Sequence, residues 1–147
     1  MDCYQHIGKY IGEIHRSSYM YFGKRFSKFG IGAGQYLFLL NLYENDGITQ
    51  EELTKKVRLD KATTARAIKK LEDEGYVRRI KKESDKRAYR LELTEKAEQI
   101  KDDVYSIMNE WESKVRMCFT DEESQELMNL LNKLSKSSLI NKEDIHE

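Results

Sequence analysis

Proline is absent from this chain of 147 residues, and cysteine occurs only twice. Without proline, no position removes a helical N–H donor, so long uninterrupted helices can form. Cys3 and Cys118 do not suggest a disulfide framework. No apolar run is long enough to span a bilayer, and the stretch MDCYQHIGKY lacks the basic and apolar regions of a secretory signal. We therefore expect a cytoplasmic protein that buries a core without disulfides or metals.

A net charge is also lacking, because 26 Lys and Arg balance 26 Asp and Glu. The two signs are nevertheless segregated along the chain. Residues 55–90 carry 14 basic and 6 acidic side chains, a net charge of +8, and the rest of the chain carries a net charge of −8. A basic middle between acidic ends is typical of a surface that binds a polyanion. A solvated charged face is the alternative.

Helical periodicity dominates both ends of the chain. Apolar residues recur at spacings of three and four over residues 4–29, and residues 34–45 are apolar on nearly all sides, which indicates a buried central helix. Thr94 is expected to cap a long helix, and the capping box that starts at Thr120 opens a last one. The apolar faces of these two helices are expected to carry Ala97, Ile100, Val104, Ile107, Trp111, Val115, Cys118, Leu127, Leu130, Leu131 and Leu134.

The basic middle has the order of a winged helix-turn-helix. A capping box of Thr49 and Glu52 opens a short helix, and Asp60 can cap a second one that Gly75 ends. The period then changes to two, and YVRRIKK and AYRLELT are predicted strands joined by ESDKR. We expect a mostly α fold with a small β-hairpin wing. The winged domain is placed at residues 31–94, and helical dimerisation regions are placed at 1–30 and 95–147.

The second helix, residues 61–74, has the pattern of a DNA-recognition helix. One side, expected to face the core, consists of Thr64, Ala67, Ile68 and Leu71. The opposite side is small and basic, so Arg66 could pair with guanine while lysines contact phosphates. The acidic run at 72–74 should point away from the duplex. An ordinary amphipathic surface helix is the alternative. The candidate DNA-binding residues here are Lys61, Ala62, Thr63, Ala65, Arg66, Lys69 and Lys70.

The hairpin has a charged tip. Asp85 and Arg87 are two apart on an extended chain, so they share a face, and Asp85 could hold the Arg87 guanidinium by charge-assisted hydrogen bonds. An oriented Arg at a hairpin tip suits insertion into a narrow minor groove. As an alternative, Asp85 only forms the turn and Arg87 is a solvated charge. The candidate DNA-binding residues of the wing are Lys82, Asp85, Lys86 and Arg87.

The stretches DKATTARAIKKLEDEGYVRR and DKRAYRLELT closely resemble the MarR family (multiple antibiotic resistance regulators), and the resemblance covers essentially the whole chain. The family's wing signature, D-x-R and then L-x-L-T, is matched by Asp85, Arg87, Leu91, Leu93 and Thr94. The resemblance implies a homodimeric transcription regulator, a repressor or an activator, that reads a pseudo-palindromic operator with its recognition helix in the major groove and its wing Arg in the minor groove. It also implies a small molecule or an oxidant that relieves binding. Two departures are Ala97, where glycine is common, and Gly32, where a hydroxyl cap is common.

The end helices carry more apolar surface than a small winged domain can cover, so we expect a dimer. Without a partner, the residues left partly exposed would include Ile100, Val104, Ile107, Trp111 and Val115. A larger monomeric core is the alternative. The family resemblance implies a pocket for a small ligand, and the candidate lining residues are Arg16, Tyr19 and Tyr21, because an Arg beside aromatic rings suits an aromatic or phenolic carboxylate. Plain packing would explain the tyrosines equally well.

Three other functions receive less support from the sequence. Redox sensing by Cys3 is a minor alternative, and Cys118 is expected to be buried on an apolar helix face. A metal site at Cys3 and His6 has only two ligands. No catalytic triad, paired carboxylates or phosphate loop appears, so we expect neither an enzyme nor a cofactor. The remaining alternative to a DNA-binding regulator is a winged-helix protein-interaction module without specific DNA binding.

Overall fold

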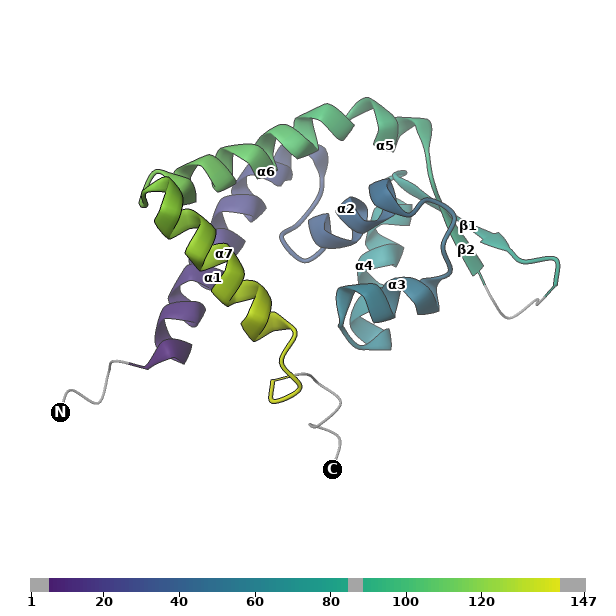
Figure 1. Ribbon diagram of the computed structural model, residues 1–147. Helices are drawn as coiled ribbons and strands as arrows, with labels where there is room; N and C mark the ends of the chain where they lie inside the picture. Colours follow the sequence, from purple (N-terminus) through teal and green to yellow (C-terminus); the bar gives the residue numbers. More distant parts are fainter. Residues whose placement is uncertain (1–5, 85–88, 141–147) are drawn as a thin grey trace. The chain divides into compact units, whose positions relative to one another are not determined.

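Helices make up most of the chain, and one antiparallel hairpin is the only sheet in its described part (Figure 1). The computed structural model describes residues 6–84 and 89–140. The elements in chain order are α1 (Ile7–Phe26), the 3-10 helix η1 (Ser27–Phe29), α2 (Tyr36–Glu44), α3 (Gln50–Val57), α4 (Lys61–Asp73), β1 (Val77–Lys81), β2 (Tyr89–Leu93), α5 (Glu95–Gln99), α6 (Lys101–Arg116) and α7 (Asp121–Ser135). This order confirms the expected winged helix-turn-helix with flanking helices.

The chain divides into two compact units, Met1–Ile107 and Met108–Glu147. The first unit contains α1 to α5, the hairpin and the beginning of α6. The second contains the end of α6 and all of α7. Within residues 6–84 and 89–140, no helix combines the length and the hydropathy that crossing a membrane requires.

The core of the first unit is built on α2, as its apolar sequence predicts. Phe38, Leu39 and Leu42 are fully buried, and α3, α4 and β2 pack against this helix. Each such side chain stabilises the fold by about 1.5–3 kcal/mol relative to an exposed one. Leu37, also expected to be buried, is 39% exposed. The reason is helical geometry, because five residues place Leu37 about 140° around the helix from Leu42.

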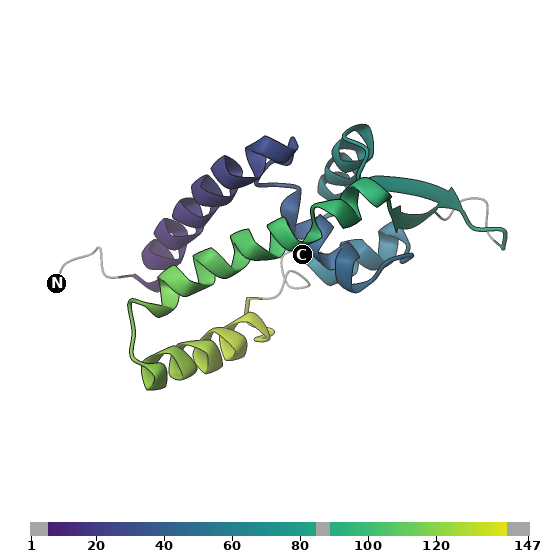
Figure 2. The same cartoon turned by 90° about the horizontal axis from the view of Figure 1, so that it is seen from above.

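The hairpin pairs β1 with β2 from Val77 opposite Leu93 to Lys81 opposite Tyr89. Leu91 and Leu93 are buried against the helices, as the alternation predicts. Tyr89 shares their face but is exposed. Figure 2 gives the reason, because the hairpin extends beyond α3 and α4, so its far end has no helix to cover it.

A short segment before α3 adds a third partner to the hairpin. The N–H of Gly47 donates to the Leu91 carbonyl (2.9 Å), and the N–H of Leu91 donates to the Ile48 carbonyl (2.8 Å). A β-bridge between Thr49 and Arg90 continues this pairing up to the first residue before α3. The start of α3 is therefore fixed directly to the second strand of the wing, a contact that the sequence pattern does not reveal.

The bend between α5 and α6 corrects a prediction, because Thr94 caps only the short helix α5 and not one long helix. Ile100 leaves helical geometry at φ −99° and ψ 0°, and α6 begins at the next residue. The Tyr43 hydroxyl donates to the Ala97 carbonyl at 2.5 Å. In an uninterrupted helix that carbonyl would pair with the N–H four residues further on. A side chain from α2 therefore takes the place of a helical bond at the bend.

Part of the apolar stripe expected to be left exposed is covered within the first unit. Val104 and Ile107 of α6 are fully buried, so their predicted partial exposure is wrong. The reason is that this end of α6 belongs to the same compact unit as the winged domain. Ile100, Trp111 and Val115 are half-buried.

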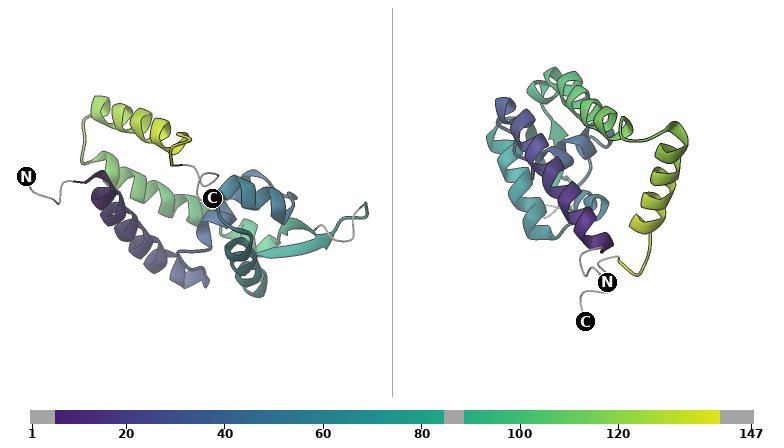
Figure 3. Two further views of the ribbon diagram at one scale, coloured as in Figure 1. Left: turned by 90° about the horizontal axis from the view of Figure 1, so that it is seen from below. Right: turned by 90° about the vertical axis from the view of Figure 1, so that its left-hand side faces the viewer.

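In the second unit the chain reverses between α6 and α7 (Figure 3). The predicted capping box is present, with Thr120 and Glu123 bonded to each other's backbone N–H at 3.2 and 3.0 Å. Cys118 is exposed, which corrects the expectation of a buried cysteine. It is exposed because α6 ends at Arg116, so Cys118 lies in the reversal and not on the apolar face of the helix.

Candidate DNA interface

The two sides of α4 are divided as its sequence predicts. Thr64, Ala67, Ile68 and Leu71 are buried. The residues predicted to contact DNA lie on the rest of the helix, where Thr63 and Ala65 are half-buried and the others are exposed: Lys61, Ala62, Arg66, Lys69 and Lys70. The structure therefore brings all seven candidates of this helix to its solvent-facing surface.

The N-terminus of α4 holds a network that orients Arg66. Asp60 accepts hydrogen bonds from the Thr63 backbone N–H (2.8 Å) and from the Thr63 hydroxyl (2.7 Å). Arg66 Nη2 in turn donates to the same hydroxyl oxygen at 3.3 Å. The hydrogen bond from the Thr63 backbone lowers the pKa of the Asp60 carboxyl, so the cap stays charged. The Arg66 guanidinium is thus directed towards the end of α4 from which recognition helices contact base edges.

The sequence analysis did not predict this network, because it considered helix caps and basic faces separately. Asp60, Thr63 and Arg66 are spaced by three residues, a spacing at which side chains on a helix are neighbours. The pattern D-x-x-T-x-x-R was therefore the available signal.

The C-terminal half of α4 carries acidic residues, as expected, but they are paired within the chain. The Asp73 carboxylate lies 2.5 Å from the Lys69 ammonium, and Glu72 lies 3.7 Å from the Arg79 guanidinium on β1. The hydrogen bond with Asp73 raises the pKa of Lys69. Lys69 therefore already has a carboxylate partner at the position where it was predicted to contact phosphate.

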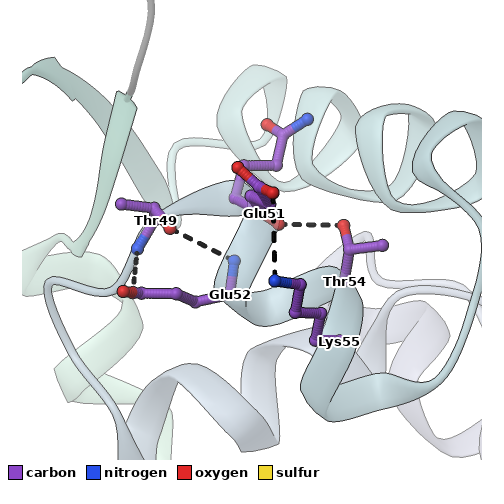
Figure 4. Close-up of polar contacts among 6 residues, drawn as sticks. Thr49, Glu51, Glu52, Thr54 and Lys55 are labelled. Atoms are coloured by element: carbon purple, nitrogen blue, oxygen red, sulfur yellow. Dashed lines mark hydrogen bonds and ion pairs between the residues drawn. The ribbon is translucent and has the colours of Figure 1, made fainter. Parts of the chain in front are cut away.

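Helix α3 begins with the predicted capping box, drawn in Figure 4. Thr49 Oγ1 accepts from the Glu52 N–H (3.1 Å), and Glu52 Oε2 accepts from the Thr49 N–H (2.9 Å). The second bond lowers the pKa of Glu52. A carboxylate therefore occupies the positive end of the helix dipole. This end of α3 is not open to a phosphate, and α3 acts as a support for the turn into α4.

The end of α4 is fastened to the hairpin and to α5. The Thr94 hydroxyl donates to the Gly75 carbonyl (2.6 Å), and the Thr94 N–H donates to the Tyr76 carbonyl (3.0 Å). The Lys96 ammonium donates to the Glu74 carbonyl and lies 4.5 Å from the centre of the Tyr76 ring. Thr94 was predicted only as a helix cap. It caps α5 and also fixes the turn that follows α4.

Of the four predicted wing residues, the structure describes only Lys82. Lys82 follows β1 and is half-buried. Its charge contributes to the lowered pKa of Glu52, which places it near the start of α3. Asp85, Lys86 and Arg87 lie outside the described residues, so the orientation of Arg87 by Asp85 stays a prediction.

The candidate ligand residues all belong to α1, but they do not share one face. Arg16 and Tyr19 are exposed and lie about 60° apart around the helix. Tyr21 lies about 140° from Arg16 and accepts a hydrogen bond from Arg25 Nη1 at 3.3 Å. The structure thus keeps Arg16 and Tyr19 as neighbours and separates Tyr21 from them. Among the residues that the structure describes, no three His, Cys, Asp or Glu side chains form a group that could hold a metal.

The chain has the order of elements that defines winged helix-turn-helix proteins. These elements are a short capped helix, a turn, a second helix with a small and basic outer face, and a hairpin. The model of the MarR family matches residues 31–89. The chain is 35% identical to the HTH-type transcriptional regulator BilQ of Clostridium symbiosum, over 87% of this chain and 90% of that protein. The chain belongs to the MarR family of transcription regulators, which agrees with the expectation that it is not an enzyme.

Solved structures give the same assignment. The chain is 44% identical to a MarR transcriptional regulator from Methanosarcina mazei Go1, with a TM-score of 0.84 over 90% of this chain and 96% of that one. It is 28% identical to a Listeria monocytogenes protein of the MarR type that was crystallised with a 26mer DNA, with a TM-score of 0.83 over 90% of this chain and 88% of that one.

Proposed function

We propose that this transcription regulator binds duplex DNA as a homodimer, with α4 in the major groove and the hairpin against the neighbouring minor groove. The observation that carries the proposal is the outer face of α4, which is small at Ala62 and Ala65 and presents Arg66, a residue bonded to the Thr63 hydroxyl. The Listeria relative crystallised with DNA supports DNA as the partner.

Each candidate residue has a role that suits its chemistry. Arg66 pairs with a guanine edge, and Thr63 and the two alanines allow α4 to approach the base pairs closely. Lys61 and Lys70 neutralise phosphates, for which a point charge is sufficient. Lys82 follows the phosphate backbone beside the hairpin, and Asp85, Lys86 and Arg87 form its minor-groove tip. Lys69 is set apart from the other lysines by its ion pair with Asp73.

Exposed apolar residues on the end helices support the homodimer. Ile7, Tyr10, Ile11 and Ile14 form a stripe on one side of α1, with Ile7 75% and Ile14 61% exposed. Leu130, Leu131 and Leu134 form an exposed stripe on α7. Contiguous apolar stripes are rare on monomers and usually mark an interface. We therefore propose residues 1–30 and 95–147 as the dimerisation region. A two-fold dimer would place its recognition helices about 34–36 Å apart, on a pseudo-palindromic operator.

We also propose that a small aromatic or phenolic ligand relieves DNA binding. The neighbouring positions of Arg16 and Tyr19 on α1 favour it, since a guanidinium beside a ring suits an aromatic carboxylate. Tyr21 would have to act from another side of the helix. The cytoplasmic location likewise stays a prediction of the sequence.

The salt dependence of binding to duplex DNA tests the proposed function. If Lys61, Lys70 and the hairpin neutralise phosphates, the logarithm of affinity should fall linearly and steeply with the logarithm of salt concentration. Affinity that does not respond to salt would contradict the proposal. A protein that binds no duplex at any salt concentration would favour the alternative, a winged-helix module that binds proteins.

A further inference from the structure

The cations of α4 are not all paired in the same way. In the C-terminal half, Lys69 is paired with Asp73 at 2.5 Å, and Glu72 is paired with Arg79 at 3.7 Å. In the N-terminal half, Lys61 and Arg66 form no ion pair with any residue that the structure describes. In the C-terminal half Lys70 likewise forms no ion pair with any described residue, so Lys69 differs from Lys61 and Lys70 in having a carboxylate partner.

The position of Asp73 is unfavourable for helix stability. Asp73 is the last residue of α4, where the helix dipole is negative and disfavours a carboxylate. A Lys followed four residues later by an acid is also the weaker of the two orders for such a pair. Both side chains are more than half exposed, 61% for Lys69 and 58% for Asp73, so the pair adds little to stability. Folding therefore does not account for an acid at this position.

We propose that Asp73 competes with DNA phosphate for Lys69 and so removes one cation from the phosphate contacts of α4. The proposal rests on the DNA-binding function proposed above. On a random duplex, binding is electrostatic, and every available cation adds a contact. On the operator, base contacts fix α4 with its N-terminal end in the groove, so a cation at the far end contributes less. Asp73 is thus a specificity-determining residue that weakens binding to random DNA more than binding to the operator.

The substitution Asp73→Asn tests this role, because it removes the charge and keeps the size of the side chain. We expect stronger binding to a random-sequence duplex, with a salt slope steeper by about 0.9, the value for one added phosphate contact. When the salt concentration is lowered from about 200 to about 50 mM, the affinity of Asp73→Asn should therefore rise about three- to fourfold more than that of the wild type. The ratio of operator affinity to random-duplex affinity should fall.

Glu112→Gln is the matched control. It removes one negative charge from another exposed pair at a spacing of four, Glu112 Oε1 with Arg116 Nε at 2.7 Å, on α6 and not on α4. It should give only the general gain of a less acidic protein, without a steeper slope. The double variant Lys69→Met/Asp73→Asn should return the slope to that of the wild type, and circular dichroism should show that all variants are folded.

Three outcomes would overturn the proposal, and they can be told apart. If the wild type binds DNA and Asp73→Asn has the same slope as Glu112→Gln, the competition is absent while the proposed function stands. If Lys69→Met alone flattens the wild-type slope as much as Lys61→Met does, Lys69 contacts phosphate in spite of Asp73. A wild type that binds no duplex contradicts the proposed function and this proposal together.

Discussion

At the residue scale, the orientation of Arg66 depends on Thr63. The Thr63 hydroxyl links the Asp60 carboxylate to the Arg66 guanidinium. An Arg side chain has many rotamers, and fixing one of them on binding reduces the affinity. Because the network already restricts Arg66 in the free protein, less conformational entropy is lost when DNA binds. Base recognition should therefore depend on Thr63 as well as on Arg66.

Substitutions at both positions test this dependence. Arg66→Ala should cost about 1–3 kcal/mol of operator binding and relax the base preference at one position. Thr63→Val removes the hydroxyl but keeps the branched shape, and it should give a smaller loss at the same base pair. Fluorescence anisotropy with operators altered at that position measures both effects.

Thr54→Val is the control for this pair of substitutions. It removes a hydroxyl that donates to the Gln50 carbonyl on α3, and it should leave the base preference unchanged. An equal loss for Arg66→Ala on every duplex would mean that Arg66 contacts only phosphate.

Two exposed carboxyls make stability depend on pH in the acid range. Hydrogen bonds from the backbones of Thr49 and Thr63 lower the pKa of Glu52 and of Asp60 below their ordinary values of 4.5 and 3.8. A carboxyl whose pKa is lowered by folding stabilises the fold above its unfolded pKa. This stabilisation is lost as the pH falls through the folded-state pKa. The free energy of unfolding should therefore decrease from about pH 5 downward.

Asp60→Asn separates the charge of the cap from its hydrogen bond. Asn is also a good N-cap but does not titrate, so the variant should lose less stability than the wild type as the pH falls. Urea denaturation at about pH 6 and about pH 3 measures the difference between the two proteins. A difference that stays constant over this range would show that the cap of α4 has no part in the acid sensitivity.

At the element scale, a hydrogen bond from Tyr43 of α2 accompanies the bend between α5 and α6. Tyr43→Phe removes the bond to the Ala97 carbonyl and should lower the free energy of unfolding by about 0.5–1.5 kcal/mol. Tyr105→Phe is the control, because its ring lies 5.9 Å from that of Tyr43 and its hydroxyl forms no hydrogen bond in the described part of the chain. Equal stability of the two variants in urea denaturation would show that the Tyr43 bond does not stabilise the fold.

The starts of α3, α4 and α7 could be predicted from the sequence because each depends on residues close in the chain. Thr49 with Glu52, Thr120 with Glu123, and Asp60 all cap their helices as predicted. Such caps need only an acceptor side chain placed next to the first N–H groups of a helix. The buried side of α4 was predictable for the same reason, since helical spacing alone determines it.

Features that depend on distant residues were not predictable. The bend at Ile100 involves a bond from Tyr43 to the Ala97 carbonyl, and the pairing of residues 47–48 with Leu91 joins segments far apart in the chain. The charge pattern could not show that Lys69 is paired with Asp73, because a basic face can be free or neutralised with the same composition. Periodicity also placed Cys118 on a helix that in fact ends at Arg116.

At the scale of the whole molecule, the stripe on α1 determines the proposed assembly. Ile11→Glu places a charge in this stripe and should shift the protein to a monomer, with weaker operator binding because only one half-site is engaged. Met20→Glu is the matched control, because Met20 is also exposed and apolar but lies nine residues, about two and a half turns, further on and so on the opposite side of the helix. Sedimentation velocity measures the assembly. A dimer that persists in Ile11→Glu but not in Met20→Glu would place the interface on the other side of α1.

The segregation of charge matters at the same scale. The chain is neutral as a whole, yet residues 55–90 carry a net charge of +8. The selection of bound duplexes from a random pool is the most direct test of whether this basic segment reads DNA as part of a dimer. We expect an inverted repeat with half-site centres about 10–10.5 base pairs apart. A pool without enrichment, or a single unrepeated motif, would contradict it.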